Sequence, residues 1–321
     1  MLKLLDKALC GACLCAFAAS LSACAGNQPP TTPLGAGQQA AVRRGTDVDL
    51  LYVGAGTTGT IYSFPDGKFV GTFGTAATIH AMCSDEKGNV FITASEKPNK
   101  SPAAGFVYEY AHGGTAPVAT LNVPSHDIPV SCSRDPKSGN LAVTSWDSRN
   151  FAPLVEVYAG ASGNPVTYTS HALGAKPQAA YDNAGNLFVT SGGNQGAELV
   201  KGGQQLEKIA FDQTLGGADH LQWDGADFAL QSFHATKYGK ERIPERVFRL
   251  QISGTKATVL GLTKFTDWLA GAAGQSWIDE GTIVATPGKH IAFWKYPAGG
   301  KALLILHPTN ASKAVTVSNA K

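Results

Sequence analysis

The chain has 321 residues, of which 26 are lysine or arginine and 24 are aspartate or glutamate, so its formal net charge is +2. Only 16% of its residues are charged. Proteins that bind nucleic acids carry basic patches that neutralise phosphates, and this balanced and sparse charge gives no sign of one. We therefore expect no nucleic-acid partner.

The first residues have the pattern of an export signal. Lys3 and Lys7 precede an apolar run from Ala8 to Ala19 that is too short to span a bilayer as a permanent anchor. The pattern predicts a signal peptide over residues 1–23. It ends in Leu21-Ser22-Ala23-Cys24, which resembles the bacterial lipobox, where the cysteine after the cleavage site becomes lipid-modified. The alternative is an ordinary secretory signal cut at small residues, with Cys24 incidental.

Lipidation of Cys24 would make it the first residue of the mature chain and would hold the protein by its acyl chains. Each buried methylene contributes about 0.8 kcal/mol to such anchoring. Ala25 rather than aspartate follows the cysteine, so the resemblance implies delivery through the periplasm to the outer membrane of the cell envelope. Residues 24–47 are rich in proline, glycine and glutamine and show no periodicity, which predicts a flexible tether. The domain then covers residues 48–321.

A five-fold repeat dominates that domain. Each copy is an apolar stretch, an acidic turn, a second strand, a variable loop, an aromatic strand and a glycine-rich turn. The turns are Asp85–Asn89, Asp135–Asn140 and Asp182–Asn186, with looser copies that begin at Asp224 and Asp279. The aspartates are separated by roughly 42 to 55 residues, the period of four-stranded propeller blades rather than of helical solenoids.

The two ends of the domain are incomplete in a complementary way. Residues 49–53, 60–64 and 68–73 supply only three strands, with no innermost strand ahead of them. Residues 314–318 form one extra strand after the last outer strand, residues 302–306. We expect this last strand to pair with residues 49–53. The sequence thus predicts an all-β, six-bladed β-propeller with four-stranded blades, closed by its C-terminal strand, which also removes an exposed sheet edge.

The repeats resemble those of NHL, regucalcin-like and YncE-type propellers, in which an Asp-x-x-Gly-Asn turn leads into an aromatic strand. This resemblance covers nearly all of residues 48–321 and implies architecture rather than activity, because such repeats host enzymes, sensors and scaffolds alike. The recurrent aspartates are interpreted as turn residues that accept hydrogen bonds from their own backbone, not as catalysts.

The resemblance also indicates what to look for at the channel mouth. Regucalcin-like proteins hold a divalent cation there with Glu, Asn and Asp side chains. The starts of the inner strands here carry His80, Pro129, Pro177, His220 and Gln275 instead. Hard cations prefer oxygen ligands, so we expect no metal and no cofactor. Streptogramin-cleaving propeller lyases pair a histidine with a carboxylate, and His220 is the candidate histidine for that role.

Two of the six cysteines, Cys83 and Cys132, fall within the folded domain, each just before an acidic turn. They lie near the ends of the inner strands of consecutive blades, and an exported protein meets an oxidising compartment. A disulfide is the favoured interpretation. Two buried thiols are the alternative, because the cysteines differ by one residue in their distance from Asp85 and Asp135. The two cysteines have no nearby CxxC or histidine partner, so their spacing is not that of zinc ligands.

Long loops gather on one face of a propeller, where the second strand connects to the third and each blade to the next. Loops on a rigid scaffold carry most binding groups, so this face is the expected functional surface. Its ligand-binding candidates are His80, His126, Asp127, Trp146, Asp147, Gln178, Asp219, His220, His234 and Gln275, with Asp267 and Trp268 on a further loop.

The neighbouring pairs Asp219-His220 and His126-Asp127 suggest acid/base chemistry, yet adjacent residues of a regular strand point to opposite faces. We therefore expect each pair to need partners from other blades. The sequence has no nucleophile motif such as GxSxG. It favours a membrane-anchored binding or scaffold module for an unidentified protein, glycan or small molecule. The alternatives are a metal-dependent lactonase or hydrolase of the regucalcin type, and a propeller lyase.

Overall fold

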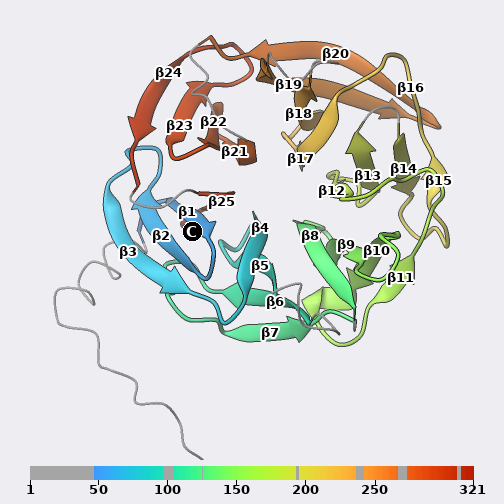
Figure 1. Cartoon of the computed structure of the whole chain (residues 1–321), viewed down its shortest axis with the longest axis horizontal. Helices are drawn as coiled ribbons and strands as arrows, with labels where there is room; N and C mark the ends of the chain where they lie inside the picture. The colour runs from blue at the N-terminus through green and yellow to red at the C-terminus, as the bar shows by residue number, and fades with distance from the viewer. Residues whose placement is uncertain are drawn as a thin grey trace, which may run out of the picture. The chain divides into compact units, whose positions relative to one another are not determined.

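A computed structural model describes residues 47–96, 104–124, 126–192, 195–235, 242–266, 273–308 and 312–321. Six blades of antiparallel strands surround a central channel (Figure 1). The predicted six-bladed propeller is confirmed. Within the described residues, no helix is long and apolar enough to cross a membrane.

Each blade runs from an inner strand at the channel to an outer strand at the rim. The first blade contains β1 (Leu50–Ala55), β2 (Thr58–Ser63) and β3 (Phe69–Gly74), and the second β4 (Thr78–Ser84), β5 (Val90–Ser95), β6 (Gly105–Tyr110) and β7 (Ala119–Asn122). The third contains β8 (Asp127–Arg134), β9 (Leu141–Asp147), β10 (Pro153–Tyr158) and β11 (Val166–Tyr168), with the short 3₁₀ turn η1 (Ala159–Ala161) between the last two.

The second half of the chain repeats this order. The fourth blade contains β12 (Gln178–Tyr181), β13 (Leu187–Gly192), β14 (Gln195–Leu199) and β15 (Glu207–Lys208). The fifth contains β17 (Gly217–Trp223), β18 (Phe228–Ala235), β19 (Arg242–Ser253) and β20 (Lys256–Lys264), whose edge also pairs in parallel with β16 (Ala210–Phe211). The sixth contains β21 (Ala273–Asp279), β22 (Thr282–Pro287), β23 (Ile291–Lys295) and β24 (Gly299–Leu306).

The last strand of the chain, β25 (Ala314–Ser318), completes the first blade. It is antiparallel to β1, with Leu50 opposite Ser318 and Gly54 opposite Ala314. All five of its residues are buried. The predicted closure is confirmed, and the observed pairing on residues 50–54 is one residue further along β1 than expected.

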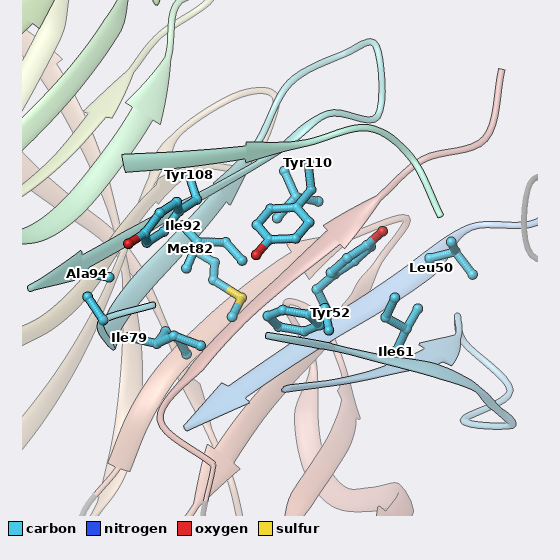
Figure 2. Packing of buried hydrophobic residues seen from close by; sticks show 13 residues of the cluster. Leu50, Tyr52, Ile61, Ile79, Met82, Ile92, Ala94, Tyr108 and Tyr110 are labelled. Carbon is cyan, nitrogen blue, oxygen red and sulfur yellow. The ribbon is translucent and has the colours of Figure 1, made fainter. Parts of the chain in front are cut away.

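Aromatic and aliphatic side chains between successive blades form the core. Figure 2 shows Tyr52 of β1 and Tyr110 of β6 packed with Met82 of β4 in the cluster between the first and second blades. The Tyr110 hydroxyl also donates a hydrogen bond to the Gly74 carbonyl, 2.6 Å away, which ties the second blade to the first.

The acidic turns are structural, as predicted. Asp85 Oδ1 accepts hydrogen bonds from the backbone N–H groups of Lys87 and Asn89, at 2.9 and 2.8 Å. Asp182 does the same for Ala184 and Asn186. The equivalent aspartates of blades three and five also accept from the backbone two residues on. Such hydrogen bonds stabilise the turn that each of these four aspartates begins.

Polar side chains also join neighbouring inner strands around the channel. Ser133 of β8 accepts from the Tyr181 N–H of β12, and Gln222 of β17 pairs with both backbone groups of Ile278 on β21. Between β4 and β8 the link is covalent, because Cys83 and Cys132 form a disulfide. These links satisfy backbone groups that the inner edge of each blade would otherwise leave unpaired.

Candidate binding cavity at the channel mouth

Four inner strands contain a β-bulge close to the point where they leave the long-loop face. The register shifts between Ile79 and Ala81 in β4, between Pro129 and Ser131 in β8, and between Ala218 and His220 in β17. In β21 it shifts between Ala273 and Ser276. A bulge leaves its extra residue outside the strand ladder and re-aims that side chain. The extra residues are His80, Val130, Asp219 and the pair Gly274-Gln275.

All of these extra residues line one cavity of about 460 Å³ at the mouth of the channel. Gln178, at the start of β12, and Ser312 and Lys313, just before β25, complete the circle, and Gly288 and Lys289 close it from the turn between β22 and β23. The cavity therefore receives residues from six different inner strands or their approaches. Its lining is His80, Ala81, Val130, Gln178, Asp219, His220, Gly274, Gln275, Gly288, Lys289, Ser312 and Lys313.

Gln275 holds the floor of this cavity together. Its Oε1 accepts hydrogen bonds from the Met82 N–H at 2.9 Å and the Val315 N–H at 3.3 Å. Its Nε2 donates to the Met82 carbonyl and to His220 Nε2, the latter at 2.9 Å. One side chain thus satisfies backbone groups of β4 and β25 and fixes the imidazole of β17. Since His220 Nε2 accepts here, its proton lies on Nδ1.

Replacement of Gln275 by alanine should lower the free energy of unfolding by about 2–4 kcal/mol. Each buried backbone group that loses its partner costs about 1–3 kcal/mol, and several lose one together. Urea unfolding would measure the change. Gln178→Ala is the matched control in the same cavity. Among the described residues its side chain makes a single long hydrogen bond, from Nε2 to the Lys176 carbonyl at 3.4 Å, so this variant should cost less than about 1 kcal/mol. Equal losses for both variants would contradict this role for Gln275.

Both histidines of the cavity are held neutral. Burial, with further effects of Lys313 and Lys176, lowers the pKa of His80 to about 4, and its Nε2 lies 2.7 Å from Ser95 Oγ. Burial lowers the pKa of His220 to about 3. Neutral imidazoles offer a hydrogen-bond donor and an acceptor rather than a charge. At neutral pH the floor of the cavity is therefore polar but uncharged.

Asp219 is the acidic group of the cavity. Burial raises the pKa of its carboxyl to about 7, although Lys176 acts in the opposite direction. Its Oδ2 is buried and has no hydrogen-bond partner among the described residues. A buried carboxylate oxygen without a donor is energetically unfavourable, and a ligand that supplied a donor to this carboxyl group would relieve that cost.

A second group of candidates lies apart from the cavity, on the third blade. Asp127 faces Asp147 across β8 and β9. The Arg149 guanidinium contacts both Asp147 oxygens, at 2.6 to 3.1 Å, and keeps the pKa of that carboxyl at about 2. Burial and the neighbouring Asp147 charge raise the pKa of Asp127 to about 6. Trp146 stacks on exposed Phe151, with ring centroids 5.0 Å apart.

Five of the ten sequence candidates thus meet in the cavity, and His126, Asp127, Trp146 and Asp147 form the separate group on blade three. His126 precedes β8 with a left-handed φ of 78°. The backbone of His234 lies in β18, but its side chain is outside what the structure describes. The same is true of residues 236–241, of Asp267 and Trp268, and of the lipidation candidate Cys24.

One expectation about side-chain direction is wrong. Asp219 and His220 were expected on opposite faces of a regular strand, but the bulge at Asp219 lets both line the cavity. The bulge in β8 places Val130 rather than Pro129 in the lining of blade three, and in blade four the candidate Gln178 lines the cavity rather than Pro177. The lysines were missed altogether. Lys313 could have been found as the residue just before the closing strand.

A second, smaller cavity lies at the opposite mouth of the channel. Trp277 lies beneath His220, with ring centroids 6.0 Å apart, and lines this cavity of about 150 Å³ together with Leu221 and both cysteines of the disulfide. His220 and Gln275 line the upper of these two cavities and Trp277 lines the lower one. Near that opposite face, Asp49, Asp279 and Glu280 bring carboxylate oxygens within 4.8 Å of one another. Asn319 already donates to Asp279 there.

No family model and no curated protein sequence matches this chain. The fold is shared with solved propellers. A protein of unknown function from Bacteroides caccae has a TM-score of 0.59 at 11% identity, over 85% of this chain and 99% of that one. A chain of a nidogen/laminin complex has a TM-score of 0.54 at 13% identity, over 85% and 99%. The Cps50 (Swd1) β-propeller domain of Myceliophteria thermophila has a TM-score of 0.52 at 10% identity, over 85% and 86%.

Proposed function

We propose that this protein is a lipid-anchored binding module of the bacterial cell envelope, whose propeller takes a small molecule in the cavity at its channel mouth. One observation carries the binding role. The extra residues of four bulged inner strands all line a single cavity of about 460 Å³, a size typical of small-molecule sites. Bulges that re-aim side chains are common next to functional sites.

The anchor rests on the sequence. Leu21-Ser22-Ala23-Cys24 resembles a lipobox behind a short apolar signal, and a proline- and glycine-rich tether follows it. With Ala25 after the cysteine, the proposed destination is the outer membrane. A tether of this length lets the propeller stand clear of the lipid surface.

A binding role is better supported than metal-dependent hydrolysis. Hard divalent cations need several oxygen ligands, yet the cavity lining offers one carboxylate, two amides and two neutral imidazoles. Gln275 is already fully engaged by Met82, Val315 and His220. The lyase alternative has a histidine and a carboxylate side by side in His220 and Asp219, but the His220 Nε2 is occupied by Gln275.

Filling the cavity should abolish ligand retention. Val130→Trp inserts a large ring at a half-buried lining position without removing a polar group. Val118→Trp is the matched control, because Val118 is exposed and lies just before the outer strand β7, outside the cavity lining. Full-length wild-type protein equilibrated with cell-extract compounds below about 1 kDa should retain a small molecule, detected by mass spectrometry. Val118→Trp should retain it as well, whereas Val130→Trp should lose it while unfolding at a similar temperature.

The same spectra test the anchor, because membrane-extracted protein should carry acyl groups on Cys24. Retention that is equal in both tryptophan variants, or no retained compound at all, would contradict a binding cavity at the mouth. An unmodified Cys24, or a mature N-terminus at another residue, would contradict the lipid anchor separately.

A further inference from the structure

We propose that the ligand of this cavity is an organic anion that also carries a hydrogen-bond donor, such as a hydroxycarboxylic acid, with Lys289 and Lys313 holding its negative group and Asp219 accepting its donor. This inference rests on the proposed binding function and specifies the chemistry of that same site. The lysines around the cavity, their effect on His80, and Asp219 support it.

The rim of the cavity is cationic. Lys289 and Lys313 line it from the sixth blade and from the approach to β25, and both ammonium groups are exposed. Lys176, before β12, is close enough to act electrostatically on His80 and Asp219. Within the described part of the chain, none of these three lysines has a carboxylate in salt-bridge contact. No ion pair among the described residues offsets the charge of Lys289 and Lys313, which therefore attracts anions from solution.

The lowered pKa of His80 reflects its burial and also the positive potential of two of these lysines. Lys313 and Lys176 both act against protonation of His80, in addition to burial. A potential that disfavours a proton at this position favours a negative group there by the same electrostatic interaction. Because the imidazoles of His80 and His220 stay neutral, they add hydrogen-bonding groups to the cavity without adding charge.

Asp219 makes the preference more specific. Asp219 lines the cavity, and its buried Oδ2 has no hydrogen-bond partner among the described residues. In its ionised form this carboxyl group only accepts hydrogen bonds, so it favours a ligand that donates one. A simple anion without a donor would face this carboxylate at close range, which is unfavourable. A ligand with both an anionic group and a hydroxyl satisfies the lysines and Asp219 together.

Four matched probes separate the two requirements. Mandelate has a carboxylate and a hydroxyl, phenylacetate the carboxylate alone, mandelamide the hydroxyl alone, and phenylacetamide neither. Titration calorimetry on the full chain should show the two acids binding at least tenfold more tightly than their amides, with mandelate the tightest. Added sodium chloride should weaken the acids and leave the amides unchanged, because screening acts on charge.

Three variants assign the effect to residues. The double variant Lys289→Gln, Lys313→Gln should weaken both acids at least fivefold and leave the amides within twofold, while Lys301→Gln, exposed on outer strand β24, should change neither. Asp219→Asn should change the affinities for mandelate and phenylacetate to different extents. It should tighten phenylacetate, by removing a like charge, and reduce the preference for mandelate over phenylacetate.

The outcomes distinguish this inference from the function on which it rests. If the amides bind as tightly as the acids, or if none of the four probes binds at 20 mM, the anionic class is wrong. A compound retained from cell extract by the wild type and lost by Val130→Trp would in that case still establish the cavity as a binding site. If Asp219→Asn leaves the ratio of mandelate to phenylacetate affinity unchanged, Asp219 has no role in selecting the donor.

Discussion

A chain that lacks residues 312–321 should lose most of the free energy of unfolding of the propeller. The deletion removes β25, which supplies the inner strand of the first blade, together with its pairing to β1. In the intact chain β25 buries Val315 and Val317 completely, and each such side chain contributes about 1.5–3 kcal/mol. The deletion also leaves the inner edge of β1 unpaired, and the Gln275 N–H loses the Lys313 carbonyl to which it donates.

The combined loss is about 5 kcal/mol or more, within the range of the total stability of an ordinary domain. Thermal unfolding followed by circular dichroism should therefore show a midpoint at least 10 °C lower, or no cooperative transition. Deletion of Lys321 alone is the control and should have no effect, because this residue is exposed and belongs to no strand.

A rescue experiment separates closure from general damage. A synthetic peptide of residues 312–321 should restore part of the lost midpoint when added to the truncated protein, since it can pair with β1 as the native strand does. A truncated chain that melts like the intact one would show that β25 does not close the ring.

The blades could be predicted from sequence because their signals are local. In the two clearest copies an aspartate is followed three and four residues on by glycine and asparagine, and the next strand begins within a residue of its expected place, as Val90 and Leu187 do. Closure was predictable for a different reason. Three strands at one end and one extra strand at the other leave β1 with an unpaired edge, and Ala314–Ser318 is the segment that can cover it.

The cavity was only half predictable because its geometry depends on bulges. Strict alternation puts Asp219 and His220 on opposite faces, and nothing in the residues around Ala218 marks the extra residue there. The lysines at the rim have no local signal either. Lys313 is one of many exposed lysines until β25 is paired, and only closure brings it beside His80 and Gln275. Long-range packing, not propensity, assembles this site.

Removal of the disulfide should lower the free energy of unfolding by about 4 kcal/mol. Cys83 and Cys132 enclose a loop of 49 residues, and in the chain-entropy model a cross-link of that length restricts the unfolded chain by about this amount. Both side chains are buried and link the inner strands of blades two and three. The double variant Cys83→Ala, Cys132→Ala, unfolded in urea beside the wild type, measures the effect.

Packing and cross-linking can be told apart by reduction. Fully reduced wild-type protein keeps both sulfur atoms and loses only the bond, so it should be destabilised nearly as much as the double variant. If reduction costs little and the alanines cost much, the sulfurs act as packing groups, as the two-thiol alternative holds. The disulfide lines the opposite mouth, below Trp277. Mandelate binding in the cavity at the channel mouth should therefore survive reduction as long as the propeller stays folded. That result would show that the disulfide is a stabilising cross-link and not a part of the binding site.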